Sequence, residues 1–215
     1  MLNELKICLK KKLFIFLPIG FFSGLPLLLT SATLGTWLAD VGIDKTTIGL
    51  FALVGLPYAL KFLWAPMLDT ALFSKSVGRR RSWIIIMQIL ICINIFIMAN
   101  INPLENTYLL AVLAFTLAFF SASHDISIDA WRIEVHKKKE LGLGAAMYVT
   151  GYRISLLVAG AGALIIADYF SWRLAFIILA SFFPLGIIMI LLCNITENKV
   201  ELNNNKQSIR SILYN

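Results

Sequence analysis

The chain has 215 residues, of which 59% are hydrophobic and only 14% are charged. Soluble domains carry roughly 25% charged residues, so this composition indicates a membrane protein with several spans. The net charge of +7 does not indicate a nucleic-acid-binding protein, because the basic residues lie in short clusters between apolar runs, as they do at membrane surfaces.

Six apolar runs follow one another along the chain, and each is long enough to cross a bilayer as a helix. Helices satisfy their own backbone polar groups in lipid, so the runs predict an all-α bundle of six membrane helices. The first run holds no charge for 27 residues, which is too long for a secretory signal, and is expected to be retained. The expected spans are residues 13–39, 46–66, 83–99, 104–124, 141–167 and 174–193, followed by a polar tail at 194–215.

Lysine and arginine are distributed unevenly over the connections between these runs. The N-terminal segment, the connections after the second and fourth runs, and the tail together hold fifteen of these residues. The remaining connections hold two. Because basic residues favour the cytoplasmic side of a membrane, both termini are predicted to be cytoplasmic.

The densest group of charges within an apolar run is the stretch SASHDISIDAWRIE at residues 121–134. Read as a continuation of the fourth helix, it places Asp125, Asp129 and Arg132 on one face, at positions i, i+4 and i+7. Asp129 and Arg132 are spaced to pair with each other. Asp125 needs a partner from another helix, because an unpaired charge in a membrane is costly.

Other site chemistries find little support in the sequence. Catalysis by the two carboxylates is a poor alternative, since neither a nucleophile nor a metal set accompanies them. The three cysteines are far apart and only two histidines occur, so we expect no disulfide framework and no metal site. A phosphate-binding loop of the nucleotide-driven pumps is also missing, and we expect no cofactor.

Two further cations lie inside apolar runs. Lys61 stands two-thirds of the way along the second run; either it snorkels to the cytoplasmic interface, or it pairs in a cavity with an acid at similar depth such as Asp125. Arg153 lies close to the membrane midplane, where its planar fork suits a carboxylate of the protein or of a substrate. A stripe of small residues points away from Arg153 and predicts a contact with another helix: Gly151, Ser155, Ala159 and Ala163.

The first run carries Ser23, Thr30 and Trp37 at seven-residue steps, which places them on one face of a straight helix. Two interpretations are open. The hydroxyls and the indole line a path for a sugar or peptide, or the hydroxyls bond back to their own helix while Trp37 anchors the outer interface. Pro26, between them, is expected to bend the helix.

The connection after the second run contains Asp69 and, nine residues later, Gly78-Arg79-Arg80-Arg81. The arginines alone suit any cytoplasmic connection. An acid followed by glycine and arginines is more specific, because it resembles the signature loop of the major facilitator superfamily. That resemblance implies a gating loop formed by Asp69, Gly78, Arg79 and Arg80.

Longer stretches are similar to the AmpG-type muropeptide permeases of that superfamily: SGLPLLLTSATLGTWLAD (23–40), TTIGLFALVGLPYALKFLWAPMLD (46–69), SASHDISIDAWRIE (121–134) and GLGAAMYVTGYRISLLVAG (142–160). The resemblance implies a proton-driven importer of anhydromuropeptides in the bacterial inner membrane. By motif, its polar positions are Lys61, Asp69, Asp125, Asp129, Arg132 and Arg153.

Such permeases have twelve or more helices, arranged as two six-helix halves around a central cavity. This chain resembles the N-terminal half, so we expect a truncated or split carrier embedded in lipid. It then works as a homodimer or with a separately encoded second half. The alternative is a non-transporting remnant or membrane scaffold.

Overall fold

The computed structural model describes residues 13–70, 77–193 and 195, and almost all of the predicted tail lies outside them. Regular structure in the described residues is entirely helical. Six helical segments there are long and apolar enough to span a membrane, which confirms the predicted six-helix bundle. The segments are Phe16–Asp40, Lys45–Leu63, Arg79–Ala99, Thr107–Val135, Leu141–Tyr169 and Trp172–Leu192.

The first span is broken into α2 (Phe16–Leu29) and α3 (Ala32–Asp40). Pro26 lies inside α2 and cannot donate a backbone hydrogen bond, and the regular helix ends one turn later. Ser31 leaves the helical region, with φ −134° and ψ −107°. The Thr30 and Ser31 hydroxyls donate to the Leu27 carbonyl at 2.9 and 2.7 Å, which satisfies an acceptor at this helix end.

The second span contains glycine and proline residues in its interior and is divided into short helical pieces. In chain order they are α4 (Lys45–Leu50), η1 (Phe51–Gly55), α5 (Leu56–Leu60) and η2 (Lys61–Leu63), and α6 (Ala65–Thr70) follows the span. The Asp44 side chain caps α4 by accepting hydrogen bonds from the Thr47 backbone N–H at 2.9 Å and the Thr47 hydroxyl at 2.6 Å.

The third and fourth spans are long, uninterrupted helices, α7 (Arg79–Ala99) and α8 (Thr107–Val135). Gly78 precedes α7 with φ +99°, a conformation that favours glycine. The fifth span consists of α9 (Leu141–Leu157), a π-helical turn η3 (Val158–Gly162) and α10 (Ala163–Tyr169). The sixth span is α11 (Trp172–Leu192).

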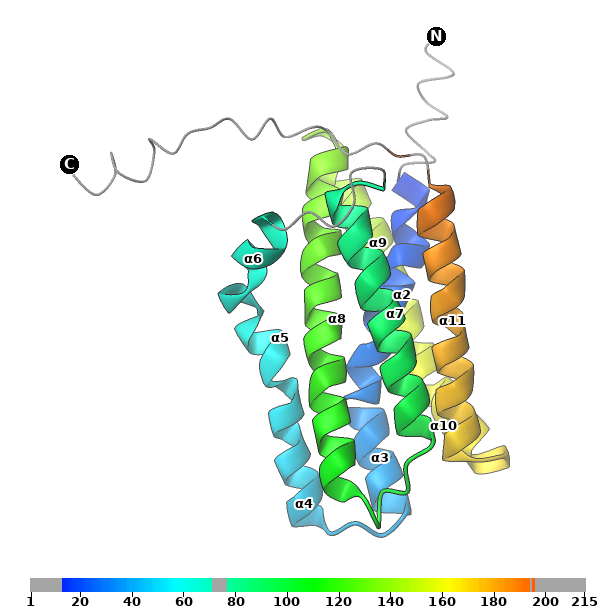
Figure 1. Cartoon of the computed structure of the whole chain (residues 1–215). Helices are drawn as coiled ribbons and strands as arrows, with labels where there is room; N and C mark the ends of the chain where they lie inside the picture. The colour runs from blue at the N-terminus through cyan, green and yellow to red at the C-terminus, as the bar shows by residue number, and fades with distance from the viewer. Residues whose placement is uncertain (1–12, 71–76, 194, 196–215) are drawn as a thin grey trace, which may run out of the picture.

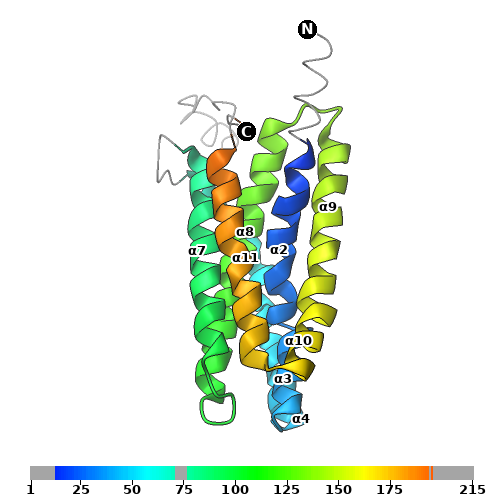
Figure 2. The same ribbon diagram turned by 90° about the vertical axis from the view of Figure 1, so that its right-hand side faces the viewer.

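The helices run alternately up and down, so the N-terminal end of α2, the starts of α7 and α9 and the ends of α8 and α11 lie at one end of the bundle (Figure 1). Helix α2 packs along α9, α7 packs between α8 and α11, and α5 stands beside α8 (Figures 1 and 2). Within the π turn, the Ala159 carbonyl accepts a hydrogen bond from the Thr33 hydroxyl at 2.7 Å. This bond joins the first and fifth spans.

The contact between α2 and α9 depends on small residues. A β-carbon on Gly20 would overlap the Tyr148 carbonyl oxygen, and one on Gly151 would overlap the Leu17 carbonyl oxygen. The predicted small-residue stripe beginning at Gly151 is buried at all four positions, so its interpretation as a helix–helix contact is confirmed.

Candidate functional site

Asp125 lies at the centre of a polar cluster where α2, α8 and α9 meet. Its side chain is only 8% exposed, and one carboxylate oxygen accepts a hydrogen bond from the Ser23 hydroxyl of α2. The same hydroxyl lies 2.8 Å from the phenolic oxygen of Tyr148 on α9. Asp125 therefore has a partner from another helix, as its position in the sequence predicts, but that partner is a hydroxyl and not an ammonium group.

Asp129 and Arg132 form the local pair that their spacing predicts, with 3.0 Å between guanidinium and carboxylate. The Arg132 guanidinium also lies over the Tyr148 ring, 5.7 Å from its centroid, within the range of a cation–π contact. Tyr148 thus touches the pair through its ring and the Asp125 cluster through its hydroxyl.

Lys61 is half-buried at the start of η2. Among the described residues it forms no hydrogen bond and no ion pair within 4.0 Å. Its ammonium group nevertheless lies close enough to attract the Asp125 carboxylate electrostatically. The structure brings Lys61 near the cluster without placing it in direct contact.

The hydroxyl stripe predicted on the first span is divided by the break after α2. Thr30 lies before the break, on the same side of it as Ser23. Its hydroxyl oxygen lies 3.4 Å from that of Tyr58 on α5. A cavity of about 300 Å³ opens beside them, between the first and second spans. Trp37 is turned away: it is 4% exposed, stacks on Trp172 and tilts against Phe176 of α11, because the backbone changes direction at Ser31.

Arg153 is exposed on the outer side of α9. Within the described residues no hydrogen bond or ion pair reaches its guanidinium. A charged group at this depth is costly against lipid, so its surroundings in a membrane must include water, an anion or another protein surface.

The arginines that follow Gly78 join three helices at one end of the bundle. Arg80 and Arg79 both bind Glu134 of α8, with contacts of 2.9 and 3.3 Å. Arg81 donates to the backbone carbonyl of Ile190 on α11 at 2.6 Å. The backbone of Asp69 belongs to α6, but its side chain lies outside the described part, so its place in the gating loop stays a prediction.

Four site residues were not predicted from the sequence. Tyr148 and Tyr152 are four residues apart in the stretch 142–160, and this spacing marks a shared helix face. Glu134 closes the stretch 121–134, where it is the remaining acid. Tyr58 is the one of the four without such a signal, because the second span is divided into short helical pieces and the direction of its side chain cannot be read from the sequence.

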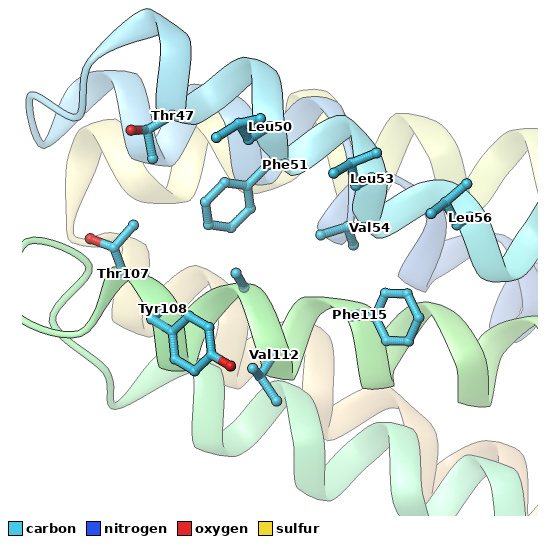
Figure 3. Close-up of a pocket in the computed structure, with 11 residues that line it drawn as sticks. Thr47, Leu50, Phe51, Leu53, Val54, Leu56, Thr107, Tyr108, Val112 and Phe115 are labelled. Atoms are coloured by element: carbon cyan, nitrogen blue, oxygen red, sulfur yellow. The ribbon is translucent and has the colours of Figure 1, made fainter.

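A second cavity, of about 570 Å³, lies between the α4–α5 segment and α8 (Figure 3). Leucine, valine and phenylalanine side chains dominate its lining, with Thr47, Thr107 and Tyr108 at one end (Figure 3). A groove of this composition suits hydrocarbon and offers few partners to a polar solute. The cavity beside Thr30 and Tyr58 and this larger apolar cavity therefore lie on different sides of the second span.

Six apolar spans define a multi-pass membrane protein. Within that class, the chain belongs to the family described as Acetyl-coenzyme A transporter 1, whose family model matches residues 12–169.

Several curated proteins are similar to the chain. The "Anhydromuropeptide permease" of Escherichia coli K12 is 46% identical over 160 residues, which cover 74% of this chain and 32% of the permease. The "Putative transporter AmpG 4" of Rickettsia felis is 36% identical over 206 residues, covering 94% and 49%. The "Putative transporter AmpG 1" of Rickettsia conorii is 32% identical over 230 residues, covering 100% and 54%.

These relatives confirm the resemblance to AmpG-type permeases that the sequence motifs predict. The chain spans about a third to a half of the length of these relatives.

Proposed function

We propose that the chain is one six-helix half of a proton-coupled importer of anhydromuropeptides in the bacterial inner membrane. The observation that carries this proposal is the buried cluster of Asp125, Ser23 and Tyr148, one residue from each of three spans. A carboxyl group held between spans can take up and release a proton, and its change of charge alters how the helices attract one another. The permease name of the Escherichia coli relative supports the substrate class.

The other polar residues take roles that follow from their positions. Arg153, exposed near the middle of the fifth span, binds an anionic group of the ligand through its planar fork. Lys61 and the Asp129–Arg132 pair adjust the electrostatic field around Asp125. Thr30 and the adjacent cavity form part of the ligand path. Trp37 supports the outer end of the bundle instead of the path.

The gating loop closes the end of the bundle where Arg79 and Arg80 bind Glu134. These contacts tie α7 to α8, and Arg81 ties α7 to α11. Breaking them frees three helix ends at once, which suits a conformational gate.

Transport needs a second six-helix half, because alternating access in such carriers comes from one half rocking against the other. A separately encoded half fits this need better than a second copy, since the two halves of a carrier supply different residues to the site. A non-transporting remnant is the competing proposal, and uptake measurements distinguish the two.

Both termini and the Gly78–Arg81 end of the bundle lie on the cytoplasmic side in this proposal, because fifteen of the seventeen basic residues in the connections belong to that side. Reporter fusions are expected to read cytoplasmic at positions 75 and 137, and external at positions 43, 102 and 170. A cytoplasmic signal at position 102 would overturn this orientation.

The direct experiment is uptake of labelled anhydromuropeptide into proteoliposomes under an imposed proton gradient. The chain is tested alone and together with the C-terminal part of the Escherichia coli permease that lies beyond the similar segment. We expect uptake only with the second half, and its loss in Asp125→Asn. The matched control is Asp168→Asn, since Asp168 is exposed on α10. Gradient-driven uptake that survives Asp125→Asn would contradict the proposal.

A further inference from the structure

The hydrogen bonds around Ser23 have a fixed direction when Asp125 is ionised. A serine hydroxyl has one proton to donate and two lone pairs with which to accept. Ser23 gives that proton to the Asp125 carboxylate, which is an acceptor only. In the 2.8 Å contact between Ser23 and Tyr148, the phenol must then be the donor. The chain of bonds runs from Tyr148 through Ser23 to Asp125.

We propose that Tyr148 is a positioning residue whose hydroxyl changes from hydrogen-bond donor to acceptor when Asp125 takes up a proton. This inference rests on the proposed function, in which Asp125 is the group that carries the proton. A protonated carboxyl group donates its O–H to Ser23, and the Ser23 hydroxyl is then free to donate to the phenolic oxygen of Tyr148. The only new covalent bond is the O–H bond on Asp125, and its proton comes from water.

The reversal releases the phenolic proton of Tyr148 for a different acceptor. Tyr148 and Tyr152 are half-buried on α9, at the border between the face packed on α2 and the exposed face that carries Arg153. The released O–H can therefore meet a carbonyl or hydroxyl oxygen of a polar ligand. Protonation of Asp125 would add a donor to the ligand site, which couples the two binding events.

The ring of Tyr148 has a separate task. It holds the Arg132 guanidinium through a 5.7 Å cation–π contact that does not need the hydroxyl. We call the hydrogen-bond chain of Tyr148, Ser23 and Asp125 the relay. A phenylalanine at position 148 keeps the ring but removes the hydroxyl on which the relay depends, so Tyr148→Phe separates the two roles. Tyr152 lies beside it, with 6.1 Å between ring centroids, and its hydroxyl forms no hydrogen bond within the described residues.

Other ionisable groups also surround Asp125. The second span contributes Lys61 and Tyr58, α8 contributes Asp129, and α9 contributes Tyr148 and Tyr152. From helix α2, the non-ionisable Ser23 hydroxyl contacts Asp125. Of these groups, only Ser23 makes a hydrogen bond to Asp125 among the described residues, and only Tyr148 hydrogen-bonds to Ser23. The relay is therefore confined to three side chains.

Infrared difference spectroscopy on the 215-residue chain in lipid nanodiscs tests the inference without any ligand. Ring-labelled tyrosine reports whether a phenol donates or accepts, and subtraction of the Tyr148→Phe spectrum isolates Tyr148. The carboxyl band lost in Asp125→Asn reports protonation of Asp125. We expect both signals to change with pH at one common midpoint. Tyr152→Phe, the matched control, is expected to keep both changes.

Ser23→Ala is expected to abolish the pH-dependent change of the Tyr148 band while the Asp125 carboxyl band still titrates, and Ser23→Thr, which restores a hydroxyl, is expected to recover it. If the Asp125 band titrates in the unmodified chain and the Tyr148 band does not follow, the relay is refuted and the proposed function stands. If the Asp125 band never titrates, both the relay and the proton-carrying role are refuted.

Discussion

The two long sides of the bundle differ in both packing and chemistry. Helices α7 and α11 lie side by side and form one flank of the bundle (Figure 2). The exposed side chains on this flank are mainly aliphatic and aromatic, for example Ile93, Phe96 and Ile188. On the face formed by the second span, α3 and α9, the exposed residues include Thr36, Thr150 and Arg153. In the most apolar stretch of each span, 56% of the residues of α7 and 39% of those of α11 are buried, against 17% in the second span and 22% in the fifth.

This difference distinguishes a surface made for lipid from one made for protein and water. An aliphatic flank needs nothing from its surroundings beyond hydrocarbon. A mid-membrane guanidinium such as that of Arg153 needs polar partners, which lipid does not supply. In the proposed carrier, we infer that the second and fifth spans face the second half, and that the flank of α7 and α11 faces lipid.

The largest expected effect comes from placing a charge on each side. Ile93→Lys introduces a cation on the lipid-facing flank and should destabilise membrane insertion by about 2.5–3.5 kcal/mol. Val149→Lys, on the exposed side of α9, should be far better tolerated when the second half is co-expressed. The yield of folded protein, measured by fluorescence-detected gel filtration, checks this prediction. Equal losses for the two variants would erase the difference between the sides.

Gly151→Ala should have the next largest effect, because it forces a methyl group into the backbone of α2 at Leu17. Overpacking of this kind costs about 1–3 kcal/mol. Gly142→Ala on the same helix is the control, since a β-carbon there meets nothing within 4 Å. Thermal unfolding of the two variants in detergent should differ clearly, and similar melting temperatures would mean that α9 is not held tightly against α2.

Arg153→Leu should stabilise the isolated chain, by roughly 1–2 kcal/mol, because it removes a cation from a surface that meets lipid when the second half is absent. In the complete carrier the same change should reduce ligand affinity. Chemical denaturation of the chain alone measures the first effect. A loss of stability in the isolated chain would show that Arg153 already has a structural partner.

The smallest expected effect concerns the helix caps on the two sides. The pKa of Asp44 is lowered from its ordinary value of 3.8, chiefly by the hydrogen bond from the Thr47 hydroxyl and then by the Thr47 backbone N–H. A lowered pKa adds stability above the ordinary value, and this contribution disappears as the pH falls through the lowered value.

Asp44→Ala should therefore reduce the melting temperature at neutral pH and have little effect in acid. Ser171 caps α11 through a hydroxyl that accepts from the Leu174 backbone N–H at 3.2 Å, and Ser171→Ala should show no such pH dependence. Melting curves at the two pH values make the comparison. A pH-independent loss for Asp44→Ala would contradict the role of its charge.

The six spans could be predicted from the sequence because hydrophobic length alone decides which segments cross a membrane. The pairing of Asp129 with Arg132 was predictable for a similar reason, since both residues lie on one helix. The need of Asp125 for a distant partner also followed from its chemistry.

The identity of that partner could not be predicted, because it depends on how separate helices are rotated against each other. Ser23 hydrogen-bonds to Asp125, and Tyr148 reaches Ser23 only after α2 and α9 have packed through their glycines. For Trp37, the sequence suggested a shared face with Ser23 that the structure does not have. A straight helix would align it with Ser23, but the backbone at Ser31 redirects it toward α11.

The most direct test of the two-sided account is the environment of single residues on each side. In a background without the native cysteines, spin labels are placed at position 150 on α9 and at position 188 on α11, and the second half is co-expressed. We expect a water-soluble relaxation agent to reach position 150, and only oxygen dissolved in lipid to reach position 188. If both positions respond to oxygen alone, the α9 face is an ordinary lipid-facing surface and the proposed difference between the two sides is wrong.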